Sequence, residues 1–410
     1  MSKIKLPHAS GNSMSICAPS TNPSGDLELK LPATIGTAGQ VLKNSDTAGT
    51  LEFGVPQRPY RNLIINGAMQ IAQRGTSSTS TGYQTVDRWA MWGAGNNTDL
   101  TQTQHDLTSS DTGPWAEGFR KSFHILNAGQ SGADAAEYVT MQYLIEAQDI
   151  ANSGWDYTSA SSYITLSFWV KSSVAQTFYP YVRSVDGTNQ LYTWAIALSA
   201  NTWTKITKTI PGNSNIQFDN DNGTGFMIQI PPYWGTNWTG TITQDQWGTY
   251  NSAVRTPDST GTWWTTSSAT FEITGIQLEV GDVATDFEHK SYGDELARCQ
   301  RFYYRHVEGN NLVACLGFSS ATNQVSGYIQ FPTTMRATPS IDHTNGDNYY
   351  RLGAGNLGGD KYIDGAWALQ GATDKSTRIY ATPQSTLTAG EPGLVDTKNA
   401  SAFIAFSAEL

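Results

Sequence analysis

Charge is scarce in this sequence, and its balance is negative. Only 15% of the 410 residues are Asp, Glu, Lys or Arg, and the formal net charge is −10. A protein that binds nucleic acid needs clustered Lys and Arg side chains to neutralise phosphates, and the sequence contains no such cluster. We therefore predict that nucleic acid is not a partner.

Cysteine and long apolar runs are also scarce. The three cysteines, Cys17, Cys299 and Cys315, are widely separated and odd in number, a pattern that favours buried free thiols over a disulfide framework. The start of the sequence has no apolar run long enough for a signal peptide or a membrane span. We expect a soluble protein that is made in a cytosol and does not insert into a membrane.

Motifs that would indicate metal binding or cofactor binding are missing or incomplete. The six histidines lie far apart, without the spacing of metal ligands, and no Gly-x-Ser-x-Gly elbow occurs. The segment 219–223 begins like a calcium loop, but its glycine comes one place early and Ile230 stands where Glu is required, so we predict a hairpin turn. The segment 353–358 matches the dinucleotide fingerprint only as a string and is predicted to be a loop. We predict no catalytic residue, no metal and no cofactor.

Carboxylate pairs for glycoside hydrolysis are defined by their distance in space, so the sequence leaves them open. Glu272 and Glu279 lie on one predicted strand and could face a groove. The alternative for Glu279, which we favour, is that its carboxylate satisfies a turn or a contact between subunits.

Glycine, threonine, serine and aromatic residues are abundant: the chain has 39 Gly, 13 Trp and 19 Tyr. With few charges, this composition favours a β-sandwich over a helical bundle. Between 163 and 170 the alternation is clean, with Ile164, Leu166, Phe168 and Val170 on one side and Thr165 and Ser167 on the other. Strands separated by turn signals, without a helical period among them, predict a two-sheet sandwich or jelly roll; they are expected at 62–71, 87–89, 136–147, 163–170, 178–185, 190–198, 203–210, 225–231 and 270–280.

The last of these strands contains a slip in its alternation. Phe271 and Ile273 are in one phase, and Ile276 and Leu278 are in the other. A β-bulge at Gly275 accounts for the slip, because glycine tolerates the kinked backbone.

A short helix is predicted after this strand. Ser291 is a good N-cap, with Asp294 three residues on. Helical spacing places Leu296, Cys299 and Tyr303 on one face, which we expect to contact protein, while Arg298 and Arg301 should face water or acidic partners.

The chain is therefore predicted to be all-β, with four parts. Residues 1–57 have too few bulky apolar residues to close a core, so we expect an extended N-terminal attachment and trimerisation region that orders only with copies of itself or on a virion protein. Residues 58–290 form the jelly-roll domain, 291–305 the helical strut, and 306–410 a smaller C-terminal β domain, with strands at 327–332, 378–380 and 402–406.

One aromatic stretch lies between two predicted strands, in sequence rich in Gly and Thr. Trp and Tyr planes stack on the flat C–H faces of sugar rings at little entropic cost. The alternative is that these side chains only pack a long loop against the sandwich or a neighbouring subunit. The candidate carbohydrate-binding residues are Tyr233, Trp234, Trp238, Trp247, Trp263 and Trp264.

Several short pieces, read in their order and spacing, resemble the fibre and adhesin proteins of tailed bacteriophages, particularly phages of marine cyanobacteria. The opening from Lys5 through Ala18-Pro19-Ser20 to Gly54 looks like the attachment end of such fibres. The other pieces are 62–67, Asp87-Arg88-Trp89, 164–170, 275–281 with 284–285 and 287–288, 299–303, 331–332 with 335–339, and Ala408-Glu409-Leu410.

The resemblance implies a homotrimer whose jelly-roll domain is similar to carbohydrate-binding modules. It implies a structural virion protein, assembled in the host cytoplasm, that binds a host surface glycan and contacts other virion proteins through its N-terminal region. Two alternatives stay open: a virion-associated polysaccharide depolymerase, and a purely structural capsid or tail appendage.

Overall fold

The chain divides into two units, Met1–Pro59 and Tyr60–Leu410. The computed structural model describes residues 3–7, 13–17, 28–36, 40–45, 47, 49–54, 60–95, 100–130, 132–353, 361–363 and 366–410. In the first unit β1 (Lys3–Pro7) pairs with β2 (Ser13–Cys17), and β3 (Val41–Asn44) pairs with β4 (Leu51–Gly54).

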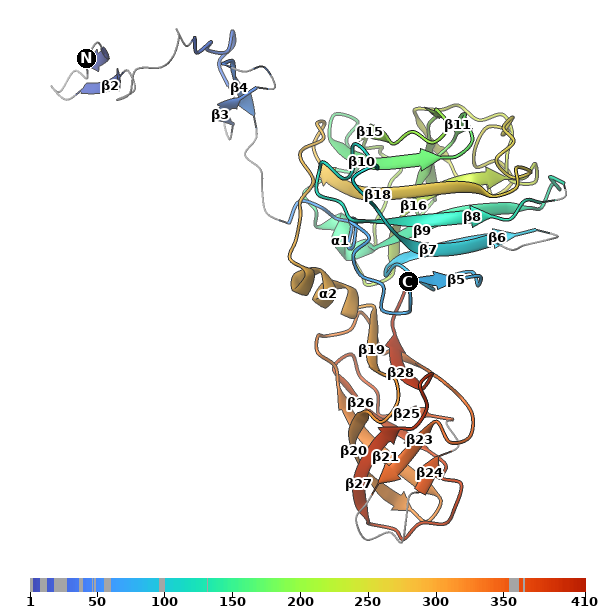
Figure 1. Cartoon of the computed structure of the whole chain (residues 1–410). Helices are drawn as coiled ribbons and strands as arrows, with labels where there is room; N and C mark the ends of the chain where they lie inside the picture. Colours follow the sequence, from blue (N-terminus) through green and yellow to red (C-terminus); the bar gives the residue numbers. More distant parts are fainter. Residues whose placement is uncertain are drawn as a thin grey trace. The chain divides into compact units, whose positions relative to one another are not determined.

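The second unit begins with a jelly-roll β-sandwich, which confirms the predicted all-β class. Figure 1 shows β10, β18, β8 and β7 side by side in the first of its two six-stranded sheets, whose order is β15-β10-β18-β8-β7-β5. The strands of this sheet are β5 (Ser77–Ser78), β7 (Leu100–Asp106), β8 (Lys121–Asn127), β10 (Tyr163–Ser172), β15 (Thr204–Pro211) and β18 (Ala269–Val280).

The second sheet has the order β17-β13-β12-β16-β9-β6. Alternate side chains of both sheets meet in one large apolar core, which includes Phe168, Ile228 and Ile273. The strands of the second sheet are β6 (Trp89–Ala94), β9 (Tyr138–Glu146), β12 (Tyr181–Ser184), β13 (Gln190–Thr193), β16 (Thr224–Trp234) and β17 (Trp247–Thr249).

The pairing of β10 with β18 confirms the predicted bulge. The register shifts between Ser167 and Trp169, opposite Gly275, whose φ is +62°. A Cβ on Gly275 would lie 2.6 Å from the Phe119 ring. Thr165 and Ser167, although on the face away from the core, are buried as well, and the Thr165 hydroxyl donates to the Gly281 carbonyl.

The prediction of a strand at 62–71 was wrong. Asn66 and Met69 have φ of 60° and 58°, and side-chain amides replace the partners that a sheet ladder would supply. The Asn62 oxygen accepts from the backbone of Ile64 and Leu278, and the Asn66 amide group bonds both backbone groups of Ile71. Apolar content alone did not distinguish this loop from a strand.

The predicted strands 178–185 and 190–198 are each broken in two. The outer pieces, β11 (Gln176–Phe178) and β14 (Ile196–Leu198), pair in a separate two-stranded sheet. Pro180 lies at the break: it has no N–H to donate, and its carbonyl accepts from Trp194 and Thr193.

Several other elements also differ from the expectations. The segment 219–223, with a bend at 221–223, leads into β16 and is not a hairpin turn, because β15 and β16 lie in different sheets. The carbonyls of Asp221 and Gly223 accept the first N–H groups of α1 (Ala147–Ala151). The short helix α1 and the strands β7 and β8 were not predicted. The 353–358 segment lies outside the described residues from position 354 onward.

The predicted helix is α2 (Tyr292–Gln300), with Ser291 as its N-cap accepting from the Asp294 N–H at 3.2 Å. Leu296 and Cys299 face a small apolar cluster with Ile65 and Phe302. Tyr303 is not on the helix, because its backbone pairs with Ser407 in a sheet instead.

Two further sheets follow α2 and share an apolar core of their own. The three-stranded sheet has the order β19-β28-β22, with β19 (Tyr303–Glu308), β22 (Ser340–His343) and β28 (Phe403–Ser407). The seven-stranded sheet has the order β24-β23-β27-β20-β21-β26-β25, with β20 (Val313–Ala321), β21 (Gln324–Gln330), β23 (Tyr350–Gly353), β24 (Lys361–Ile363), β25 (Ala368–Gln370), β26 (Ser376–Ala381) and β27 (Pro392–Thr397). The strands predicted near the C-terminus are confirmed.

Cys299 and Cys315 are free and buried, as predicted, while the Cys17 side chain lies outside the described part of the chain. Within the described residues, no helix has the length and apolar character needed to cross a membrane.

Candidate functional site

Three of the six candidate aromatic residues pack inside the sandwich. Trp263 and Trp264 are fully buried, and the Tyr233 ring stacks on Trp264 with a centroid distance of 4.8 Å and an interplanar angle of 13°. Both indoles are satisfied internally, with Trp263 donating to the Thr270 carbonyl and Trp264 to a Glu137 carboxylate oxygen. For these side chains the structure shows the packing role.

Trp247 lies apart from the others, on β17. It is half-buried against the sandwich core, its ring meets Tyr192 edge-on at 5.5 Å, and its N–H donates to the Pro211 carbonyl at 2.6 Å. Trp247 therefore contributes to packing at the edge of the sheet.

Trp234 and Trp238 come together on the outer face of the second sheet. A register shift in β16 between Ile230 and Tyr233 spans two consecutive prolines, 231 and 232, which have no N–H for the ladder. The shift leaves Tyr233 facing the core and turns Trp234 to the outer face, where it is only 5% exposed and packs with Tyr181 and Leu191. Trp238 follows in the next loop, 6.0 Å from Trp234 between ring centroids.

Tyr138 of β9 completes this aromatic group. Its ring stacks on Trp234 at 4.8 Å with an interplanar angle of 20°, and it meets Trp238 edge-on at 6.0 Å. Tyr138 and Trp238 are half-buried, so part of each ring reaches solvent. The N–H groups of Trp234 and Trp238 have no acceptor among the described residues.

Two arginines extend the aromatic group along the same face. The Arg255 guanidinium lies 4.7 Å from the Trp234 centroid and 4.5 Å from that of Trp238. Arg183 stacks on Tyr250 at 3.8 Å, and Arg255 lies 5.9 Å from the same ring. We call Tyr138, Trp234, Trp238, Tyr250, Arg183 and Arg255 the outer-face cluster.

A row of amides and hydroxyls crosses the sheet beside the cluster. Gln229 accepts from the hydroxyls of Tyr181 and Thr140, at 2.8 and 3.2 Å, and its amide N–H donates to Gln142 at 2.8 Å. Burial raises the pKa of the Tyr181 phenol, and the nearby Arg255 charge opposes that shift. Gln142 is half-exposed, so the row ends in a side chain that solvent reaches.

A small groove adjoins the cluster on the other side of Trp234. It is lined by the proline bulge of β16 and by the segments around Tyr179 and Pro257. The lining residues are Thr177, Phe178, Tyr179, Pro231, Pro232, Tyr233, Trp234, Thr256, Pro257 and Ser259.

Sequence reasoning missed four members of the cluster: Tyr138, Tyr250, Arg183 and Arg255. Tyr138 could have been found, because Val139 and Met141 of the same strand alternate toward the core and leave Tyr138 on the opposite face. The two arginines carry no sequence signal, because only the fold brings them to one ring.

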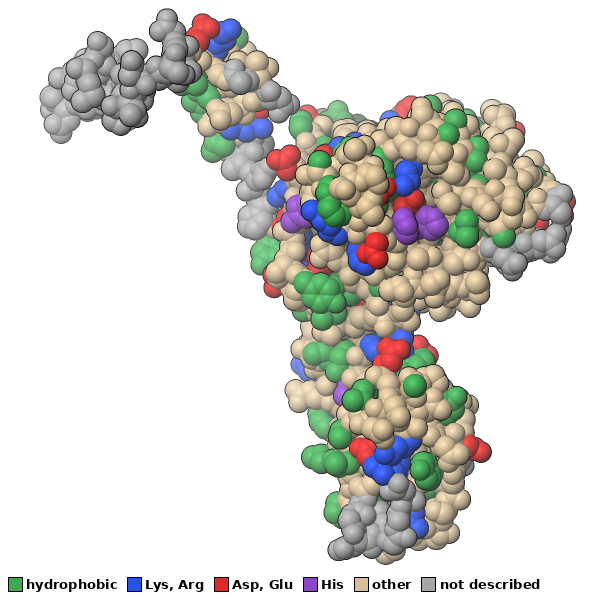
Figure 2. Space-filling model, viewed as in Figure 1, with side chains coloured by type: hydrophobic (Ala, Val, Ile, Leu, Met, Phe, Trp, Pro, Cys, Tyr) green, Lys and Arg blue, Asp and Glu red, His purple; other side chains and the backbone are tan. Residues whose placement is uncertain are grey.

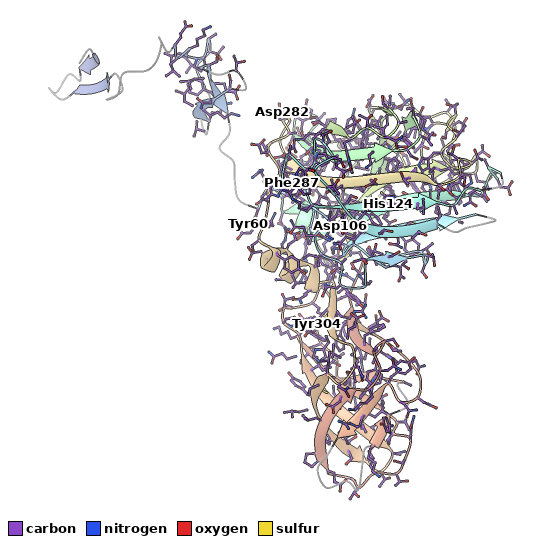
Figure 3. All side chains as sticks on the ribbon, viewed as in Figure 1. Tyr60, Asp106, His124, Asp282, Phe287 and Tyr304 are labelled. Atoms are coloured by element: carbon purple, nitrogen blue, oxygen red, sulfur yellow. The ribbon has the colours of Figure 1, made fainter. Side chains whose placement is uncertain are left out.

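The opposite sheet carries a cluster of ionisable side chains on its outer face. Figure 2 shows histidine side chains beside acidic and basic ones there, and Figure 3 labels His124 on β8. Glu272 accepts from Lys171 at 3.0 Å and from the Ser122 hydroxyl at 2.8 Å, and it lies 3.2 Å from Nδ1 of His105. Lys171 also pairs with Asp111 at 3.1 Å.

Neither carboxyl of this cluster suits a general acid. Burial would raise the pKa of Glu272, but the hydrogen bond to His105 and the Lys171 charge outweigh burial and lower the pKa to about 2. Burial would also raise the pKa of Asp111, but hydrogen bonds from Trp203, Thr108 and Lys171 outweigh burial and lower the pKa to about 2. A glycosidase needs one carboxyl that holds a proton near its working pH, and these two are ionised.

Glu279 serves a turn, as we favoured. Its carboxylate accepts from the backbone N–H of Thr285 at 2.8 Å, from the Thr285 hydroxyl at 2.6 Å and from Gln277 at 2.9 Å. Across the residues that the structure describes, no group of three or more His, Cys, Asp or Glu side chains is arranged to hold a metal ion.

No protein-family model and no curated protein matches the chain. Solved structures of similar fold include the enzymatically active domain of tailspike protein 4 of bacteriophage CBA120, at 12% identity and a TM-score of 0.30, covering 56% of this chain and 23% of that one. A putative sugar binding protein from Bacteroides thetaiotaomicron matches at 10% identity and 0.27, covering 54% of this chain and 100% of that one. The N-terminal cellulose-binding domain of Cellulomonas fimi β-1,4-glucanase C matches at 10% identity and 0.24, covering 52% and 97%.

Proposed function

We propose that this chain is a non-catalytic carbohydrate-binding protein and that the outer-face cluster is its binding surface. The observation that carries the proposal is the half-exposed aromatic pair of Tyr138 and Trp238 beside the polar row that ends at Gln142. Aromatic planes bind the C–H faces of a sugar ring, and amide side chains beside them bind its hydroxyls.

The same proposal extends to the biological setting. We propose a homotrimeric fibre or adhesin of a tailed bacteriophage virion that adsorbs to a host surface glycan and contacts other virion proteins through residues 1–57. The order and spacing of the short pieces that resemble phage fibre proteins support this setting. Three weak sugar sites on one trimer would bind a repetitive surface with high avidity, because the second and third contacts are intramolecular.

Affinity electrophoresis against a panel of purified bacterial and algal polysaccharides tests the binding site. Trp238→Ala and Tyr138→Ala should each weaken binding about tenfold or more per site, by comparison with losses of about 1–3 kcal/mol per stacked ring in base–aromatic contacts. Trp203, a half-buried tryptophan directly before β15 of the first sheet, provides the matched control, and Trp203→Ala should bind as the parent does.

If both cluster variants bind like the parent, the aromatic group only packs the loop. That result would favour the alternative of a purely structural capsid or tail appendage. Release of reducing sugar from a bound polysaccharide would favour the depolymerase alternative. Light scattering on the purified full-length chain tests the trimer, and a well-ordered monomer at micromolar concentration would contradict it.

A further inference from the structure

We infer that the ligand of the outer-face cluster is an acidic glycan, with carboxylate or sulfate groups held by Arg183 and Arg255. The inference rests on the proposed function and adds the chemical class of the ligand. It is drawn from the positive charges of the cluster, because aromatic rings can bind a neutral sugar without any charged side chain.

Arg255 is placed as an anion receptor over an aromatic floor. Its guanidinium makes cation–π contacts with Trp234 and Trp238, whose rings are inclined at 58° to each other. Its Nε donates to the Ser252 carbonyl at 3.1 Å, and the side chain is also hydrogen-bonded to the Tyr181 hydroxyl. A guanidinium placed by cation–π contacts can present N–H groups to the two oxygens of a carboxylate or sulfate.

Arg183, on β12, has a similar arrangement. Its guanidinium stacks on Tyr250 at 3.8 Å, and its Nε has no hydrogen-bond acceptor among the described residues. The Asn189 side-chain oxygen, in its hydrogen-bonded orientation, accepts from Nη2 of Arg183. This half-buried cation thus has a neutral hydrogen-bond partner and no partner of opposite charge among the described residues.

Neither arginine forms an ion pair with any carboxylate that the structure describes. Other partly buried cations of the sandwich do: Lys171 pairs with Glu272, Lys208 with Asp245, and Arg61 with Glu279. In a chain of net charge −10, two unpaired guanidinium groups that share the Tyr250 ring repel each other. An anion bound beside both would reduce that repulsion and add charge-assisted hydrogen bonds to the guanidinium groups.

The probes for the test are polygalacturonate for carboxylate, dextran sulfate for sulfate, and unsubstituted dextran as the neutral reference. Full-length protein should bind at least one of the charged polymers ten times more tightly than dextran, and raising NaCl from 50 to 500 mM should weaken that binding. Arg255→Gln and Arg183→Gln should each reduce it about tenfold. Arg120→Gln is the matched control, because Arg120 also stacks on a tryptophan, Trp115, at 3.7 Å outside the cluster.

The outcomes separate this inference from the proposed function. Binding of polygalacturonate alone assigns the carboxylate, and binding of dextran sulfate alone assigns the sulfate. If Trp238→Ala abolishes binding of a glycan while both arginine variants bind as tightly as the parent, the surface binds sugar and the acidic inference is wrong. It is also wrong if neither charged polymer binds, or if Arg120→Gln loses as much binding as Arg255→Gln. Unchanged thermal unfolding of the variants keeps the comparison free of folding effects.

Discussion

The Arg88 guanidinium and the Glu409 carboxylate form an ion pair that is almost entirely buried: 1% of the Arg88 side chain and 7% of the Glu409 side chain are exposed. Arg88 also donates to the Leu144 carbonyl at 2.7 Å and lies 3.5 Å from the Phe302 ring centroid. Arg74 pairs with the same carboxylate at 3.3 Å. Two ion pairs thus hold Glu409 against Arg74 and Arg88, which precede β6 of the sandwich.

Glu409→Gln should therefore destabilise the fold strongly. Removing one partner of a buried ion pair leaves an uncompensated charge and typically costs about 3–5 kcal/mol. Chemical denaturation gives the free energy of unfolding. Glu308→Gln is the control, because Glu308 is 57% exposed and lies 3.6 Å from Arg305, and it should cost less than about 1 kcal/mol. Equal losses for the two variants would contradict the structural role of Glu409.

Stability should fall in acid through Glu272. Its pKa in the fold is about 2 against an ordinary value of 4.5, so the ionised form stabilises the fold above pH 4.5, and this contribution is lost as the pH falls from about 4.5 to about 2. Linkage gives a contribution of the order of 3 kcal/mol. Denaturation of the parent and of Glu272→Gln at a series of pH values tests it. The difference between the two should shrink through this window, and a difference independent of pH would count against the prediction.

Gly275→Ala should unfold more easily than the parent, because the substitution meets both backbone strain and a clash. Gly275 and Gly371 share a φ of +62°, but only at Gly275 would a Cβ lie 2.6 Å from the Phe119 ring, while at Gly371 nothing lies within 4 Å. Gly371→Ala should cost about 1 kcal/mol from the left-handed backbone alone. The loss of unfolding free energy in Gly275→Ala should be larger than that in Gly371→Ala by about 1–3 kcal/mol. Thermal unfolding of the two variants measures the difference. Equal shifts would show that Phe119 moves aside freely.

Leu296→Asp should loosen the contact of α2 with the sandwich. Leu296 packs on the cluster of Ile65, Cys299 and Phe302, and a carboxylate placed there without a partner is costly. We expect a lower melting temperature and a broader or divided transition in calorimetry. Tyr292→Asp, on the same helix at a site that is 60% exposed, should leave the transition unchanged. If Leu296→Asp shows a single transition at the melting temperature of the parent, α2 does not couple the unfolding of the sandwich to that of the C-terminal β domain.

Elements with a regular period could be predicted because the period itself encodes the buried face. The alternation from Ile164 to Val170 predicted β10, the slip at Gly275 predicted the bulge, and Ser291 with Asp294 predicted the start of α2. The loop at 62–71 was misassigned because Asn62 and Asn66 supply hydrogen bonds across the fold, and such partners leave no trace in local apolar content.

The sequence by itself determined the all-β class, the start of the strut and the presence of an aromatic-rich loop, since these follow from local periodicity, capping and composition. Only the tertiary structure decided which aromatic side chains pack in the sandwich core and which lie on the outer face of the second sheet. Trp264 and Trp234 are equally aromatic as residues, but the proline bulge in β16 turns Trp234 outward while Trp264 stacks on Tyr233 inside. The convergence of Arg183 and Arg255 on Tyr250, from positions 72 residues apart in the chain, is likewise set by the pairing of distant strands and the loop that covers them.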